Sequence, residues 1–266
     1  MMKEYTIPVA NTYTSHGSSE GSQVKFFYAG KWFKQNLNGY EGKAEHLASC
    51  VLACSNIDDF VWYDECIVNG RKGCVSDSFL CENERFMSLD RLHKNYTGER
   101  ISNQVMQYNQ PKDRLKYVED FVFKYTNLDI STYLSDTFAL DAFILNCDRH
   151  FNNLGVVYNG RNRTFRPAPI FDNGAGFLSS FAKFPPYNSI EENAQQVVGF
   201  PICSNLDLQA HTAEIQLCID YEMLESQFLQ YEEPSRALDV LRYQMEYKRN
   251  FFPDFCKKQR DYEEER

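Results

Sequence analysis

The sequence predicts an α+β protein built from two lobes, a small β-rich lobe over residues 1–81 and a larger helical lobe over residues 82–266. Two observations lead to this division. In the first part of the chain, short apolar runs are bounded by turn residues, which is typical of strands. Beyond about residue 82, the apolar residues recur mainly at helical spacing, and one further strand pair interrupts them at 154–171.

The first lobe is expected to contain two strand pairs with a helix between them. Residues 24–28 and 31–34 flank Ala29-Gly30, which predicts a hairpin. Residues 41–54 place Leu47 on the same helical face as Val51 and Cys54. Strand signals return at 60–68 and 73–80, and Asn69-Gly70 predicts the turn between them.

The second lobe is predicted to begin with helices over 82–92, 113–125 and 131–146. A hairpin follows, with strands at 154–158 and 164–171 and a two-residue primed turn at Asn159-Gly160. Residues 178–200 have no regular pattern. Further helices are expected over 206–217, 222–231 and 234–247.

The composition excludes several classes of protein. The chain has 266 residues with 28 Lys and Arg against 37 Asp and Glu, a net charge of −9, so no direct nucleic-acid binding is expected. No segment approaches the roughly 20 apolar residues that span a bilayer, and the first residues lack the apolar core of a secretory signal. The nine cysteines are scattered without a zinc-binding pattern. We therefore expect a cytoplasmic protein with reduced thiols and no membrane association.

The residues that carry chemistry lie between 146 and 174. Phosphoryl transfer needs a carboxylate that orients the acceptor hydroxyl, an oxygen ligand for a divalent metal, and a second carboxylate that holds the metal on the phosphates. Asp148 and Asn153 supply the first two from one loop, and the predicted hairpin returns Asp172 to it. Hard oxygen ligands of this kind suit Mg²⁺ or Mn²⁺ better than zinc.

The segment Asp148-Arg149-His150-Phe151-Asn152-Asn153, followed by Asp172-Asn173-Gly174, resembles the catalytic and metal-binding segments of HipA-like kinases. The similarity extends to their small members of the cell-translocating-kinase type. It implies a two-lobed protein-kinase-like fold with Asp148 as the catalytic base. It also implies that Asn153 and Asp172 are the metal ligands. Phosphatidylinositol kinases share the same arrangement.

A kinase also needs a lysine on a strand that holds the nucleotide phosphates and a glutamate that orients this lysine. Lys34 ends a predicted strand, with Lys25 and Lys31 as competing choices. Glu41, at the start of the predicted helix, is the first candidate for the partner of Lys34, and Glu45, one turn later, is the second. The stretch from Gly39 to Glu45 also resembles the small HipA-like kinases.

The remaining nucleotide contacts are expected from two loops. Ser18, Ser19 and Gly21 lie in a small-residue loop whose backbone amides could cover the phosphates. In HipA-like kinases this loop carries a serine that is autophosphorylated, which makes Ser15, Ser18, Ser19 and Ser22 candidates here. Phe79 and Leu80, at the junction of the predicted lobes, are expected near the adenine.

The resemblance implies an ATP- and magnesium-dependent serine/threonine protein kinase that phosphorylates itself and a protein acceptor. It also implies an antitoxin-like partner or a toxin-like role, and leaderless secretion as an effector. One alternative is a phosphoinositide or small-molecule kinase with the same ATP site, although the net charge and the lack of a polybasic run count against a lipid substrate. The other is a catalytically silent, kinase-like binding module, against which the intact Asp148, Asn153 and Asp172 argue.

Overall fold

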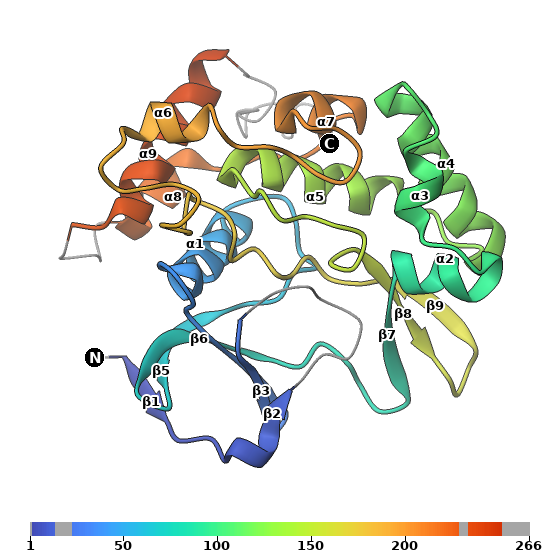
Figure 1. Cartoon of the computed structure of the whole chain (residues 1–266), viewed down its shortest axis with the longest axis horizontal. Coiled ribbons are helices and arrows are strands. Elements are labelled where there is room, and N and C mark those ends of the chain that lie inside the picture. Colours follow the sequence, from blue (N-terminus) through green and yellow to red (C-terminus); the bar gives the residue numbers. More distant parts are fainter. Residues whose placement is uncertain (1, 14–22, 229–233, 252–266) are drawn as a thin grey trace, which may run out of the picture.

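The computed structural model of the chain describes residues 2–13, 23–228 and 234–251. The first part of the described chain forms a sheet with one helix, and most of the helices follow (Figure 1). In chain order, the elements of the first part are β1 (Lys3–Tyr5), a 3₁₀ turn (Val9–Asn11), β2 (Thr12–Tyr13), β3 (Lys25–Tyr28), β4 (Lys31–Gln35), α1 (Glu41–Ala53), β5 (Asp64–Val68) and β6 (Arg71–Asp77).

These strands form a six-stranded sheet in the order β1-β5-β6-β4-β3-β2, in which only the β1–β5 pair is parallel. Both predicted hairpins are confirmed. Tyr28 pairs with Lys31 around Ala29-Gly30, and the corresponding two-residue turn at Asn69-Gly70 joins β5 to β6. All four turn residues have positive φ, which a type I′ turn requires.

The second part begins with a strand. Its elements are β7 (Glu84–Ser88), α2 (Leu89–Thr97), α3 (Ile101–Val105), α4 (Pro111–Thr126), α5 (Ser131–Ile144), β8 (Gly155–Asn159), β9 (Thr164–Pro167), α6 (Ile190–Ala194), α7 (Leu206–Thr212), α8 (Tyr221–Phe228) and α9 (Arg236–Phe251). The three strands form a second sheet in the order β7-β8-β9.

Several predictions for this part were wrong. The segment 178–200 contains α6, and the helix expected over 206–217 ends at Thr212. Two further differences have a visible cause. The helix expected over 82–92 begins only at Leu89, because Glu84–Ser88 pairs with β8 and the Ser88 hydroxyl accepts a hydrogen bond from the Arg91 amide as the N-cap of α2. The hairpin between β8 and β9 has a four-residue loop instead of a two-residue turn. Its last strand pair is Asn159–Thr164, and the Asn159 side chain accepts hydrogen bonds from loop amides.

One hydrophobic core joins the two parts of the molecule. Leu47 and Val51 of α1 belong to the same buried cluster as Phe138 and Ala142 of α5. In Figure 1, α1 lies between the six-stranded sheet and the helices of the second part. The opposite face of the sheet has a smaller core of its own, formed by Ile7, Phe26, Phe33, Cys66, Val68 and Val75. α1 therefore packs against the sheet on one side and against the core that it shares with the second part on the other.

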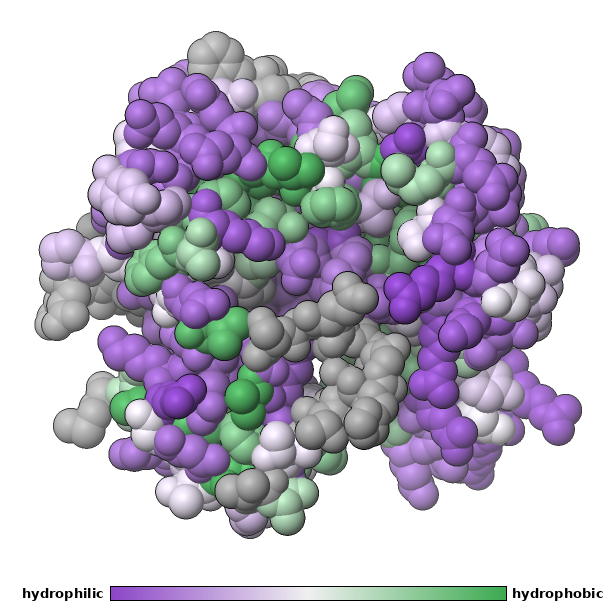
Figure 2. All heavy atoms as spheres, in the orientation of Figure 1, coloured by the Kyte–Doolittle hydropathy of each residue, from purple (hydrophilic) through white to green (hydrophobic). Residues whose placement is uncertain are grey.

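The view in Figure 2 shows a face that is mainly hydrophilic, with hydrophobic residues in small separate groups, as is normal for a protein surface. Within the described ranges, no helix is both long and apolar enough to cross a membrane.

We expect the shared core to show in stability. Replacing Leu47, which is fully buried, by Ala should lower the free energy of unfolding by about 2–5 kcal/mol, because the removed methyl groups leave a cavity between α1 and its neighbours. Leu208→Ala is the matched control, since Leu208 is 50% exposed. Urea denaturation of both variants measures the difference. An equal loss in the two would contradict the packing described here.

Candidate functional site

Lys34 lies at the centre of a buried group of charged side chains. Successive side chains of β4 point to opposite faces of the sheet, so Phe33 lies in the smaller core and Lys34 lies on the face toward α1. The Lys34 ammonium Nζ is 2.5 Å from Glu45 Oε1 and 2.6 Å from Asp172 Oδ1, and it lies 4.8 Å from the centre of the Tyr63 ring. A strand, the helix that follows it in the chain and a loop 138 residues away therefore meet at one nitrogen atom.

The charges of this group stabilise one another. Burial acts to lower the pKa of Lys34, but the carboxylates of Asp172 and Glu45 outweigh it and raise the pKa well above its usual value. Burial likewise acts to raise the pKa of Asp172, but the ammonium groups of Lys25 and Lys34 hold it far below its usual range. Lys34 and Asp172 are therefore both ionised at neutral pH.

The first choice for the partner of Lys34 was wrong. Glu41 points back to the turn before α1, where its carboxylate accepts hydrogen bonds from the Leu37 amide at 3.2 Å and the Asn38 amide at 3.0 Å. This arrangement satisfies amide groups just before the helix begins. Glu45, one turn later, faces the sheet and pairs with Lys34, and its second oxygen accepts a hydrogen bond of 2.7 Å from the Asn173 amide.

The two competing lysines lie on opposite faces of the sheet. Lys25 is the cross-strand partner of Lys34, and its ammonium is 3.5 Å from Asp172 Oδ2. Lys31 instead forms an ion pair with Asp77 at the exposed surface. Both oxygens of the Asp172 carboxylate therefore face lysines, and both lysines belong to adjacent strands of the sheet.

Asp148 lies in the loop that follows α5. The main-chain amide of Asp148 donates to the side-chain oxygen of Asn146 at 3.2 Å. The side-chain amide of Asn153 donates to the main-chain carbonyl of Asp148, also at 3.2 Å. The Asp148 side chain reaches solvent, but the surrounding protein desolvates its carboxylate and raises its pKa. His150 opposes this increase, and Asp172 adds to it. An accessible carboxylate with a raised pKa is suited to accept a proton.

A second buried ion pair holds the two loops of the site together. Arg149 is fully buried and donates to Asp141 of α5 at 2.9–3.2 Å. The same guanidinium donates to the Phe171 carbonyl at 2.6 Å and to the Asn173 side chain at 2.5 Å. Arg149 therefore holds both chain neighbours of Asp172, and in this way it fixes the position of Asp172.

The sequence patterns did not single out Asp141. Its role had one visible signal, an acidic residue within the otherwise apolar run 138–144. The Asp141 carboxylate also accepts a hydrogen bond of 2.8 Å from the Asn146 side chain, so the same residue supports the start of the Asp148 loop.

The oxygen groups of the site fit a magnesium ion. The Asn153 amide bonds to Asp148 through its nitrogen, so its oxygen is the atom that it can offer to a cation. Asp172 adds an ionised carboxylate. Within the described ranges, no three His, Cys, Asp or Glu side chains converge on one point. Mg²⁺ needs no such group when one or two protein ligands are completed by substrate phosphates and water.

The other predicted contacts are only partly described. The Phe79 ring packs on the rings of Phe171 and Phe86, with centroid distances of 5.4 and 6.0 Å. The main-chain carbonyl of Phe79 accepts a hydrogen bond from Arg166. Leu80 is half-buried beside it. Their proximity to an adenine stays a prediction. Ser18, Ser19 and Gly21 lie outside the described residues, as do Ser15 and Ser22.

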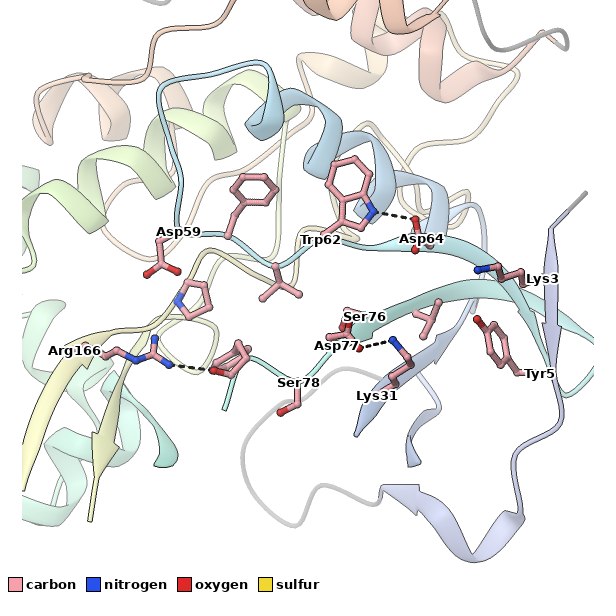
Figure 3. A pocket seen from close by; sticks show the side chains of 15 residues that line it. Lys3, Tyr5, Lys31, Asp59, Trp62, Asp64, Ser76, Asp77, Ser78 and Arg166 are labelled. Atoms are coloured by element: carbon pink, nitrogen blue, oxygen red, sulfur yellow. Dashed lines mark hydrogen bonds and ion pairs between the residues drawn. The ribbon is translucent and has the colours of Figure 1, made fainter. Parts of the chain in front are cut away.

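A separate cavity of about 520 Å³ lies beside the segment 76–79 (Figure 3). Asp59, Trp62, Ser78 and Arg166 are among the residues that line it. Neither Lys34 nor the residues around Asp148 and Asp172 line this cavity. It is therefore distinct from the charged group described above.

The buried Arg149–Asp141 pair gives a stability prediction. Asp141→Asn should lower the free energy of unfolding by about 3–5 kcal/mol, because it leaves a buried guanidinium without a counter-charge. Asp120→Asn is the matched control, since Asp120 forms an exposed pair with Lys116 that should contribute less than about 1 kcal/mol. Chemical denaturation compares the two variants. Equal losses would show that the buried pair does not hold the site together.

Comparison with known proteins identifies the fold. No protein-family model and no curated protein matches the sequence. The structure is similar to that of the proinflammatory kinase CtkA of Helicobacter pylori, with a TM-score of 0.64 and 12% identity over 96% of both chains. This match confirms, at the level of the fold, the resemblance to kinases that the motifs predicted. The chain has the mixed α+β fold of this kinase, with an N-terminal sheet and a helical C-terminal part.

Proposed function

We propose that the protein is a serine/threonine protein kinase that uses ATP with Mg²⁺ or Mn²⁺ and phosphorylates itself. The observation that carries the proposal is the ion-pair group in which Lys34 contacts both Glu45 and Asp172. A lysine held in this way by a helix glutamate and a metal-binding aspartate is what a kinase needs to position nucleotide phosphates. The kinase fold supports the same conclusion.

The lysines act on the donor side of the reaction. Lys34 is held in place by its two carboxylate partners, so its ammonium can meet the α- and β-phosphates with little loss of side-chain freedom. Lys25 approaches the same carboxylate from the neighbouring strand and adds a second positive charge. Both charges favour a polyanionic ligand at this face of the sheet.

Asn153 and Asp172 would hold the metal. When bound, the ion neutralises charge on the phosphates as the γ-phosphoryl group leaves. The two lysines keep Asp172 ionised for this purpose. Arg149 fixes the loop around it through the Phe171 carbonyl and the Asn173 side chain.

Asp148 acts on the acceptor side. Its carboxylate reaches solvent, so a serine or threonine hydroxyl of a protein substrate has access to it. It orients the hydroxyl for attack and accepts the hydroxyl proton as the new bond to phosphorus forms. Asn146 holds the Asp148 backbone in place during this step.

The direct test is incubation with ATP and Mg²⁺ followed by intact-mass spectrometry. The wild type should gain mass in steps of one phosphoryl group, and Asp172→Asn and Lys34→Met should lose about 100-fold or more of the rate because they remove charge stabilisation. Lys31→Met is the control, because Lys31 lies on the other face of the sheet.

Each other outcome has a defined meaning. If ATP raises the melting temperature but no mass is gained, vesicles containing phosphoinositides and a panel of small alcohols test another acceptor. If ATP neither binds nor reacts, the kinase proposal is wrong and a silent binding module replaces it.

The corrected partner of Lys34 gives a second prediction. Glu45→Gln should lower the autophosphorylation rate about 10- to 100-fold, the scale of a misplaced catalytic group. Glu41→Gln keeps an acceptor for only one of the Leu37 and Asn38 amides, but it does not touch Lys34, so it should leave this rate near that of the wild type. Initial rates at saturating ATP compare the two variants. A larger loss in the Glu41 variant would contradict the pairing.

A further inference from the structure

The chain segment after Asp172 brings another cation to the acceptor side of the site. We infer that Lys183 is a further catalytic residue, whose ammonium contacts the phosphoryl group as it passes from ATP to the acceptor hydroxyl. This inference rests on the proposed kinase function and adds a residue to it. Three features of the structure carry it: the turn that fixes the Lys183 backbone, the closeness of Lys183 to Asp148, and the lack of a carboxylate partner for Lys183 among the described residues.

The position of Lys183 is fixed by the turn that contains it. The Lys183 and Phe184 amides both donate to the Ser180 carbonyl, at 3.2 and 2.8 Å, and the Phe184 side chain is 4% exposed. Ser180 forms a β-bridge with Gly39, just before α1. These two segments of the chain approach so closely that a Cβ atom on Gly39 would lie 1.7 Å from the Ser179 carbonyl oxygen. This turn is therefore attached both to the core and to the segment that leads into α1.

The Lys183 ammonium lies beside the predicted base. Its Nζ atom is 3.9 Å from the Sγ atom of Cys147, the residue directly before Asp148. Its positive charge also acts on the Asp148 carboxylate, where it opposes the effect of desolvation on the pKa. The 180–184 turn and the Asp148 loop therefore face each other, and an acceptor hydroxyl at Asp148 has Lys183 nearby.

The Lys183 ammonium has no ion-pair partner in the part of the chain that the structure describes. Lys183 is exposed, and among the described residues it forms no ion pair with a carboxylate. Its contact with Cys147 is to a thiol, which is a weak hydrogen-bond acceptor. By contrast, Arg149 is fully buried and its donors are engaged by Asp141 and the 171–173 loop. Lys183 therefore has ammonium donors available for a ligand, and Arg149 does not.

This placement fits a role in the transfer step. The bond between the γ-phosphorus and the bridging oxygen breaks, its electron pair stays on ADP, and the acceptor oxygen forms the new bond while its proton passes to Asp148. Negative charge is spread over the three outer oxygens of the phosphoryl group during this step. Lys34 and Lys25 approach from the sheet, and Lys183 approaches from the acceptor side without giving up a proton.

The test uses water as the acceptor, because its reaction does not depend on recognising a protein. ATP hydrolysis and autophosphorylation are measured for the wild type, Lys183→Met, Lys183→Arg and the control Lys112→Met, in which an exposed lysine of α4 is removed. If Lys183 contacts the phosphoryl group, Lys183→Met lowers kcat of both reactions about 100-fold with an unchanged KM for ATP. Lys183→Arg restores most of the rate, and Lys112→Met matches the wild type.

Two results would overturn the inference while leaving the kinase proposal intact. One is a loss of autophosphorylation by Lys183→Met with normal ATP hydrolysis, which would place Lys183 in acceptor binding. The other is a normal rate of both reactions. A wild-type protein that neither binds nor hydrolyses ATP would instead contradict the proposed function itself. Thermal unfolding of each variant identifies any loss that comes from misfolding.

Discussion

Lys34 imposes the central constraint on this structure, because a buried ammonium group is costly unless carboxylates surround it. Its two partners, Glu45 and Asp172, come from α1 and from the loop after β9. The sheet, the helix and the loop must therefore come together before the charge of Lys34 is satisfied. The Tyr40 hydroxyl reinforces the same junction with a hydrogen bond of 2.6 Å to the Phe177 carbonyl.

The ion pair between Arg149 and Asp141 supports this arrangement from the helical side. Arg149, in the loop after α5, donates to the carbonyl of Phe171 and to the side chain of Asn173, the two neighbours of Asp172. The Glu45 carboxylate also accepts a hydrogen bond from the main-chain amide of Asn173. The loop that carries Asp172 is therefore held by charged side chains from both parts of the molecule. This dual attachment explains how a loop can present an ionised carboxylate in a fixed position.

Sequence could predict the elements that local patterns specify, and it failed where tertiary contacts decide. Asn69-Gly70 has the residue types that a primed turn favours, and Gly30 marks the turn between two apolar runs, so both hairpins were predictable. The choice between Glu41 and Glu45 depends on which helix face meets the sheet, which spacing alone left open. β7 forms because β8 pairs with it, overriding a helical pattern. The role of Asp141 depends on Arg149, a partner that folding brings to it.

The most direct test of this account is a crystal structure with a non-hydrolysable ATP analogue and Mg²⁺. We expect phosphates within hydrogen-bonding distance of Lys34, with the metal between Asn153 and Asp172 and the γ-phosphate directed toward Asp148. A nucleotide whose phosphates lie away from Lys34, for example beside Trp62 in the separate cavity, would contradict this arrangement. So would a metal ion that Asp172 does not contact.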